Sequence, residues 1–142
     1  MIAATMDYLL DTHACIALNK GEPASVRARF DKAVHAGAQV WVPAVVLYEL
    51  WYGVAKSARP KENAEDLTTF LSGPVRVLGF EEEDAREAGD VRASLERIGK
   101  PIGAYDLLIA GQALSRKLTL VTANTKEFAR VKSLVWEDWG KG

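Results

Sequence analysis

Three carboxylates stand as isolated charges inside apolar segments of the chain. Asp11 follows an apolar run in LLDTHACI, Glu49 is the only charge in AVVLYELWYGVA, and Asp106 is the only charge in PIGAYDLLIAGQALS. Burying a charge costs free energy unless the charge is paired or binds a metal ion. These three acids are therefore the residues whose type and position most need a chemical explanation.

Each of these acids also has a structural explanation. Asp11 stands where a residue would cap the start of a helix, and Asp is favoured at that position. Glu49 has no Lys or Arg four residues away, so it would need a solvated helix face or a distant Arg. Asp106 opens a predicted helix and would stabilise the helix dipole. The sequence leaves both explanations open for each residue.

Taken together, the three acids predict a site for a divalent cation. Ligand sites in open α/β sheets form outside the carboxyl ends of the strands, and Asp11 ends a predicted strand. Hard cations such as Mg²⁺ or Mn²⁺ prefer oxygen ligands. The sequence has no Cys/His cluster for a zinc site, since His13 and His35 are too few and too far apart.

A fourth polar group follows the apolar stretch LTLV. Thr122, Asn124 and Glu127 lie at the end of another predicted strand and would share the edge with the three acids. The two neutral side chains offer oxygen atoms, and Glu127 offers a carboxylate. The structural alternative is a polar turn that Phe128 anchors to the core, and by itself the segment favours this alternative.

Apolar periodicity predicts strands that alternate with helices. Strands are expected at residues 6–10, 39–42, 75–78, 118–122 and 133–136. Helices are expected at 14–18, 23–37, 44–57, through 67–71, 81–98 and 106–118. Such alternation predicts an α/β fold in which helices cover both faces of a mainly parallel sheet. No linker divides the chain, so residues 1–142 are expected to form a single domain.

Composition narrows the class of protein. The net charge of −1 argues against tight nonspecific binding of nucleic acid, which usually requires a basic excess. The single cysteine fits a reducing cytoplasm. No apolar run is long enough to span a bilayer, and the N-terminus lacks the basic start of a signal peptide. We therefore expect a cytoplasmic protein with no membrane partner.

The ordered segments of this chain resemble a known family. The resemblance covers LLDTHACI, VPAVVLYELWYGVAKS, GKPIGAYDLLIAG, LTLVTANTKEFARV and WEDW, and so nearly the whole chain. Their order and spacing are similar to those of the PIN-domain nucleases, and specifically the VapC toxins of bacterial type II toxin–antitoxin modules. The resemblance implies a three-layer α/β/α sandwich with a mainly parallel central sheet.

The resemblance also implies a role for each matched residue. Asp11, Glu49 and Asp106 match the family's first three acidic positions, which bind Mg²⁺ or Mn²⁺. Asn124 occupies the fourth acidic position as a further candidate catalytic residue, and its neutral amide is a weaker ligand, so the presence of a second metal ion stays open. His13 stands where many relatives carry Asn.

The implied function is that of a toxic, metal-dependent endoribonuclease. Its expected substrate is a structured RNA, with a tRNA anticodon loop as the leading candidate. A VapB-type antitoxin is expected to neutralise it, and a homodimer and higher hetero-oligomers with the antitoxin are implied. The antitoxin is expected to place a basic side chain over Glu49 and Asp106, with apolar anchors on the helix that bears Tyr48, Trp51 and Tyr52. If those aromatic residues were wholly core, the chain would act alone.

Two other functions compete with this one. A phosphatase of the haloacid dehalogenase type also begins with a strand that ends in Asp, but it requires a second Asp where this chain has His13. A non-cleaving PIN-like module that binds RNA or protein is the second alternative. The presence of all three carboxylates favours a nuclease over such a module.

Overall fold

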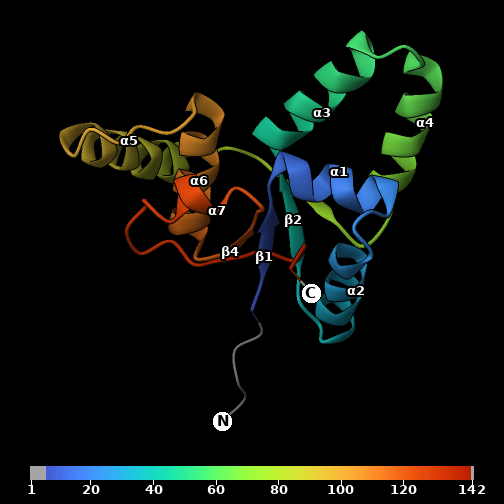
Figure 1. Ribbon diagram of the computed structural model, residues 1–142, viewed down its shortest axis with the longest axis horizontal. Coiled ribbons are helices and arrows are strands. Elements are labelled where there is room, and N and C mark those ends of the chain that lie inside the picture. Colours follow the sequence, from blue (N-terminus) through green and yellow to red (C-terminus); the bar gives the residue numbers. More distant parts are fainter. Residues whose placement is uncertain (1–5, 142) are drawn as a thin grey trace.

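The computed structural model describes residues 6–141, in which five parallel strands form one sheet (Figure 1). The strands are β1 Tyr8–Leu10, β2 Val40–Pro43, β3 Arg76–Leu78, β4 Thr119–Val121 and β5 Trp136–Glu137. Their order is β3-β2-β1-β4-β5, and all neighbours are parallel. Because β1 and β4 are adjacent, the segments that follow them begin side by side at the same edge of the sheet.

Helices flank the sheet on both sides. Within the described residues they are α1 Thr12–Lys20, α2 Ala24–His35, α3 Ala44–Lys56, α4 Pro60–Leu71, α5 Glu82–Arg97, α6 Ala104–Arg116 and α7 Thr125–Phe128. In Figure 1, α1 to α4 lie on one side of β1 and β2, and α5 to α7 lie on the other. The predicted α/β/α sandwich with a parallel sheet is confirmed.

The two central strands are buried on both faces. Leu9 and Leu10 of β1, and Leu120 and Val121 of β4, belong to the main hydrophobic core. Strands with helices on both faces read as continuous apolar runs rather than as alternating ones. This is why the two strands were visible in the sequence and why polar groups at their ends lie beside a rigid core.

The helix that carries Asp106, α6, is fixed by close packing against α5. A Cβ atom at Gly111 of α6 would lie 2.5 Å from the backbone nitrogen of Ala88 in α5, so the backbones approach as closely as glycine allows. The buried Asp84 of α5 accepts hydrogen bonds from Ser115 and, at 3.1 Å, from Arg116. These contacts give Asp106 a rigid support.

Several predicted elements differ from the structure in their bounds or their type. Helix α6 begins at Ala104, which makes Asp106 its third residue rather than its first. Helix α1 spans Thr12–Lys20 and is longer at both ends than predicted. The last strand begins at Trp136, because Ser133 adopts a left-handed conformation with φ 69° that is incompatible with a strand. The predicted polar turn after β4 contains the short helix α7.

Two further expectations concern membrane-spanning helices and the N-terminus. Within residues 6–141, no helix is both long enough and apolar enough to cross a membrane. The expectation that the N-terminus is not a signal peptide falls partly on residues 1–5, which lie outside the described part of the chain.

Candidate active site

Asp11 lies between the end of β1 and the start of α1. Its backbone N–H donates to the carbonyl of Val121 in β4 at 3.1 Å, which ties the residue to the edge of the sheet. Its side chain accepts a 2.9 Å hydrogen bond from the backbone N–H of Ala14 and so caps α1. The structural explanation considered for Asp11 is therefore correct. A carboxylate has further lone pairs, so capping leaves it able to bind a cation.

The environment of Asp11 disfavours its charged form. Burial raises the pKa of this carboxyl above its ordinary value, and the nearby charge of Glu49 raises it further. Hydrogen bonds from Thr122 and the Ala14 backbone, and the proximity of His13, partly oppose the rise in pKa. Because the net shift is upward, Asp11 is a carboxylate whose charge is incompletely compensated by the protein.

Glu49 faces Asp11 from helix α3. Its Oε1 atom accepts a 2.8 Å hydrogen bond from the hydroxyl of Thr12, the residue that follows Asp11. No ion pair among residues 6–141 includes Glu49, so the distant Arg considered from the sequence is not seen there. Thr12 therefore holds Glu49 toward the start of α1.

Asp106 lies in a second polar group with Asn124 and Glu127. The side-chain amide of Asn124 donates to Asp106 Oδ2 at 3.3 Å and also to the Glu127 carboxylate. The backbone N–H of Asn124 donates to the hydroxyl of Thr122 at 2.9 Å. This chain of contacts joins the α7 segment to the end of β4 and places a neutral donor between two acids.

The pKa of Asp106 shows that the two polar groups act on each other. The pKa of Asp106 is raised to about 6, chiefly by burial and then by the charge of Glu127 and a hydrogen bond with it. The charges of Asp11 and Glu49 make smaller contributions to the same rise in pKa. The carboxylates thus repel one another across the edge of the sheet, and a cation between them would relieve that repulsion.

The side chains of the site offer oxygen atoms of the kind that bind a divalent cation, but they do not enclose one. Among residues 6–141, no three His, Cys, Asp or Glu side chains lie close enough together to enclose a metal ion. The structure instead brings Asp106 and Glu127 together through Asn124, and places Glu49 beside the Asp11 segment through Thr12. The donor atoms are carboxylate oxygens, the ligands that Mg²⁺ and Mn²⁺ prefer.

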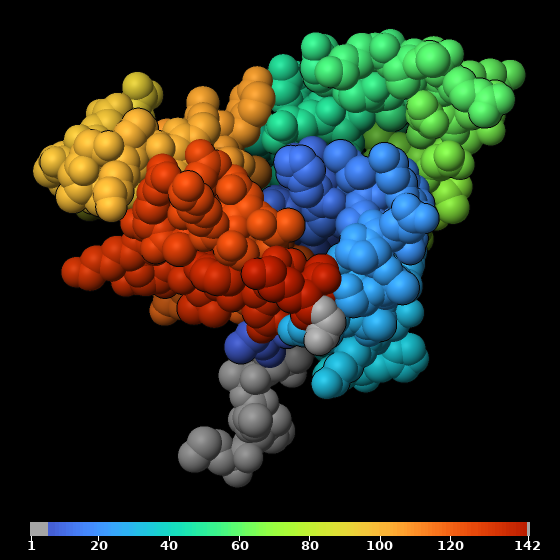
Figure 2. Space-filling model, in the orientation of Figure 1, coloured from blue at the N-terminus to red at the C-terminus, as the bar shows by residue number. Residues whose placement is uncertain are grey.

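Two tyrosines connect the helices that carry Glu49 and Asp106. The hydroxyl of Tyr105 lies 3.3 Å from that of Tyr48, and the rings meet edge to face with centroids 5.7 Å apart. In Figure 2 the start of α6 meets α3 above α1. The hydrogen bond with Tyr48 raises the pKa of Tyr105, and the charge of Glu49 contributes. This contact helps to fix the distance between the two helices.

Sequence reasoning missed the positioning roles of Thr12 and Tyr48. Thr12 directly follows the first acid, and Tyr48 and Tyr105 directly precede the second and third. Adjacency to an isolated acid was the available signal. It could not show that Tyr48 and Tyr105 touch, since 57 residues separate them.

Comparison with known proteins shows to which family the chain belongs. The PIN domain model matches residues 8–134. The chain belongs to the PIN-domain family. It is 42% identical over 134 residues to the tRNA(fMet)-specific endonuclease VapC of Shigella flexneri, covering 94% of this chain and 98% of that protein. It is 38% identical to ribonuclease VapC2 of Rickettsia felis, covering 96% and 100% of the two chains.

Solved structures of VapBC proteins have the same fold as this chain. VapBC2 from Rickettsia felis bound to a promoter DNA fragment matches with a TM-score of 0.88 and 35% identity, over 94% of this chain and 99% of that one. VapBC-1 from nontypeable Haemophilus influenzae matches with a TM-score of 0.86 and 32% identity, over 96% and 100%. The predicted relationship to the VapC ribonucleases is therefore confirmed. PIN-domain ribonucleases of this type generally depend on a divalent metal ion.

Proposed function

We propose that this chain is the toxic endoribonuclease of a toxin–antitoxin pair and acts in the cytoplasm as a single PIN domain. It would hydrolyse phosphodiester bonds in a structured RNA with the help of Mg²⁺ or Mn²⁺. The observation that carries the proposal is the placement of the acids at the carboxyl edge of the sheet, where Asn124 joins Asp106 to Glu127 and Thr12 holds Glu49 beside the Asp11 segment. Acids crowded at the carboxyl edge of a sheet require a counter-charge, and RNA can approach them only when that charge is present.

The residues of the site have distinct roles in this proposal. Asp11, Glu49 and Asp106 would hold the cation, which when bound supplies an activated water and offsets charge on the phosphate. Thr12 orients Glu49 through its hydrogen bond. Asn124 holds Asp106 and Glu127 in place by donating to both carboxylates.

The proposed substrate is an RNA with an exposed loop. The VapC relatives of Shigella flexneri and Salmonella typhimurium are named as tRNA(fMet)-specific endonucleases. Unpaired loops expose base edges that a protein can read, whereas the edges in an RNA helix are largely hidden. A tRNA anticodon loop therefore remains the leading candidate for this chain.

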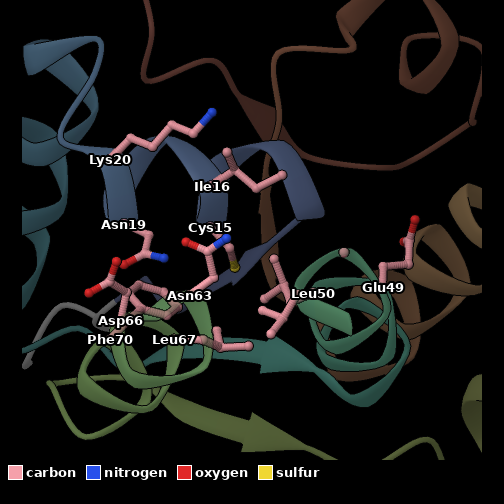
Figure 3. Close-up of a pocket in the computed structure, with 12 residues that line it drawn as sticks. Cys15, Ile16, Asn19, Lys20, Glu49, Leu50, Asn63, Asp66, Leu67 and Phe70 are labelled. Carbon is pink, nitrogen blue, oxygen red and sulfur yellow. The ribbon is translucent and has the colours of Figure 1, made fainter. Parts of the chain in front are cut away.

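The proposed partner is a VapB-type antitoxin, since the structures matched above are VapBC complexes. A cavity of about 430 Å³ lies between α1, α3 and α4, with Leu50, Leu67 and Phe70 in its wall and Glu49 at one end (Figure 3). Apolar side chains of an antitoxin helix would fill this cavity, and a basic side chain beside them would reach the acids.

The aromatic face of α3 is a separate surface from this cavity. Tyr48, Trp51 and Tyr52 are 55%, 40% and 57% exposed, so the idea that they are wholly core is wrong. None of the three lines the cavity among the described residues. Their role as antitoxin anchors stays a prediction, as do the homodimer and the higher hetero-oligomers.

Cleavage of RNA by the purified chain tests the proposal. We expect cleavage of tRNA with Mg²⁺ or Mn²⁺, none with EDTA, and neutralisation by the antitoxin encoded beside the toxin gene. Asp11→Asn, Glu49→Gln and Asp106→Asn should each abolish most cleavage, whereas Asp90→Asn, an exposed acid on α5, should not. Full cleavage in EDTA would contradict the mechanism, and RNA binding without cleavage by the wild type would indicate a binding module instead.

A further inference from the structure

A small hollow opens directly beside the candidate active site. It has a volume of about 110 Å³ and lies where the start of α1 meets the segments that follow β4 and β5. His13 and Thr122 line it, and both also influence Asp11: the Thr122 hydroxyl through a hydrogen bond and His13 through its charge. The hollow is therefore continuous with the site and is not a separate cavity elsewhere on the molecule.

The inner wall of the hollow is apolar and rigid. Val26, Val121 and Trp139 form it and are almost completely buried. The indole N–H of Trp139 donates to Glu137 at 2.9 Å, and the Trp139 ring packs edge to face on Tyr8 with centroids 5.1 Å apart. This wall cannot collapse easily, so the hollow is preformed.

Contacts with α2 hold the same wall from outside. Arg29 of α2 forms a 3.1 Å ion pair with the Glu137 oxygen that also accepts from Trp139. In Figure 2 the C-terminal segment, in red, lies against the first helices of the chain, in blue. The wall is thus tied to both β1 and α2.

Besides the buried Thr122, two polar residues line the hollow, whose surface is otherwise apolar. These are His13, which is exposed, and Asp138, which is partly buried. Asp138 Oδ1 accepts a 2.9 Å hydrogen bond from the backbone N–H of Gly140, which orients the carboxylate. A carboxylate has about four acceptor sites, so most of the hydrogen-bonding capacity of Asp138 remains for a ligand.

We propose that this hollow holds one unpaired base of the RNA, next to the bond that is cut, and favours a base with an exocyclic amino group. The inference rests on the proposed ribonuclease function. An apolar slot far smaller than the roughly 300 Å³ of a drug-sized pocket suits a single planar group. The His13 ring would stack on the base, as aromatic side chains do on splayed RNA bases.

Asp138 supplies the selectivity in this proposal. A carboxylate accepts hydrogen bonds but does not donate them, and it pairs with amino groups such as N4 of cytosine. Adenine, guanine and cytosine carry such a group with two N–H donors, whereas uracil offers only its N3–H, which lies between two carbonyl oxygens that the carboxylate would repel. The chain should therefore cleave poorly where uracil occupies this position.

Base substitution in a cleaved RNA hairpin provides the test. Each position flanking the cut is varied, and adenosine is also replaced by purine riboside, which lacks the amino group. At one position we expect about a tenfold loss of kcat/KM for uridine and for purine riboside. Asp138→Asn should abolish this discrimination, because an amide both donates and accepts, while it can still accept from Gly140.

Matched variants separate the hollow from general effects. His13→Ala should raise KM for every base, since it removes stacking. His35→Ala changes the other histidine of the chain, which lies on α2, and should leave KM unchanged. Asp90→Asn controls for loss of an acidic charge. Thermal unfolding of each variant confirms that the fold is intact.

The outcomes distinguish this inference from the proposed function. If the wild type cleaves RNA but Asp138→Asn and His13→Ala leave base preference and KM unchanged, the base site is wrong and the ribonuclease assignment stands. If these variants instead lose antitoxin binding alone, the hollow belongs to the antitoxin and the base site is again wrong. If the wild type cleaves no RNA with either metal ion, both proposals fail.

Discussion

The side-chain amide of Asn124 donates a 3.3 Å hydrogen bond to the carboxylate of Asp106, across the junction between α7 and α6. The same amide donates to Glu127, so a single neutral side chain separates two acids. One amide cannot cancel their repulsion, and the pKa of Asp106 remains raised to about 6 by burial and by Glu127. Asp106 is therefore held in a form that costs stability without a cation.

Replacing Asp106 should abolish activity and stabilise the fold. At neutral pH, above its raised folded-state pKa, the ionised Asp106 destabilises the folded chain. Asp106→Asn removes this cost and should raise the free energy of unfolding in EDTA by about 1 kcal/mol, after allowance for solvent screening. Chemical denaturation in EDTA and RNA cleavage in Mg²⁺ measure the two effects.

A gain in stability together with a loss of activity would identify Asp106 as a residue of the site. A merely structural Asp106 would lose stability and activity together on substitution. Asn124→Ala should reduce cleavage less than Asp106→Asn, because Asn124 only holds Asp106 and Glu127 in place. Wild-type cleavage by Asp106→Asn would show that this acid is not part of the site.

The hydroxyl of Thr12 should affect the cleavage rate because it orients Glu49. Thr12→Val keeps the shape of the side chain but removes the 2.8 Å hydrogen bond to Glu49. A hydrogen bond of this kind contributes about 1 kcal/mol, so we expect about a fivefold fall in kcat with little change in KM. Steady-state cleavage of RNA measures both constants.

Two further variants test whether Thr12 acts through its hydrogen bond to Glu49. Thr12→Ser restores the donor and should recover most of the activity. Thr68→Val changes an exposed threonine of α4 and should leave cleavage unchanged. Equal losses for Thr12→Val and Thr12→Ser would exclude the hydrogen bond as the cause.

Much of the architecture was predictable because it depends on local pattern. The continuous apolar runs of β1 and β4 predicted a buried parallel sheet, and chain order placed polar groups at its carboxyl edge. Asp11, Glu49 and Asp106 were identifiable as isolated charges in apolar surroundings. The four-residue α7 was missed because it is too short for a helical period to be visible.

The contacts that organise the site depend on packing and were beyond sequence reasoning. Thr12 and Glu49 are 37 residues apart, and Asn124 and Asp106 are 18 apart. Which side chains meet depends on how α1, α3 and α6 pack on the sheet. The sequence also offered a cap or a ligand as alternative roles for Asp11, whereas the structure shows that a capping residue can keep free carboxylate lone pairs.

The close approach of α5 and α6 should tolerate no side chain at Gly111. A Cβ atom there would lie 2.5 Å from the nitrogen and 2.6 Å from the Cα of Ala88. Since backbone atoms cannot yield as side chains do, Gly111→Ala should lower the free energy of unfolding by about 2 kcal/mol. It should also reduce cleavage by displacing Asp106. Thermal unfolding and activity assays follow the two effects.

Gly89 provides the control on the neighbouring helix. A Cβ atom at Gly89 of α5 meets no atom within 4 Å. Gly89→Ala should therefore stabilise the chain by about 0.5 kcal/mol through helix propensity alone. If the two variants had the same stability, the tight packing of α5 on α6 would be refuted.

The ion pair of Asp84 with Arg116 should give the fold a characteristic response to acid. Burial by itself would raise the pKa of Asp84, but hydrogen bonds from Arg116, Ser115 and the Glu81 backbone outweigh it and lower this pKa below 3.8. A lowered folded-state pKa contributes stability above the ordinary value and loses it as the pH falls toward the folded-state value. The wild type should thus lose this contribution below about pH 4.

Arg116→Met should reverse the sign of this dependence. Without the guanidinium, burial dominates and raises the pKa of Asp84, so the variant should be about 2 kcal/mol less stable than the wild type at neutral pH. The difference should shrink on acidification, because Asp84 is then protonated in both proteins. Arg92→Met breaks the exposed pair of Arg92 with Glu96 and should change stability by less than about 0.5 kcal/mol at any pH. Denaturation of the three proteins across the acidic range measures these differences, and a gap between wild type and Arg116→Met that stayed constant with pH would show that Asp84 is not the group responsible.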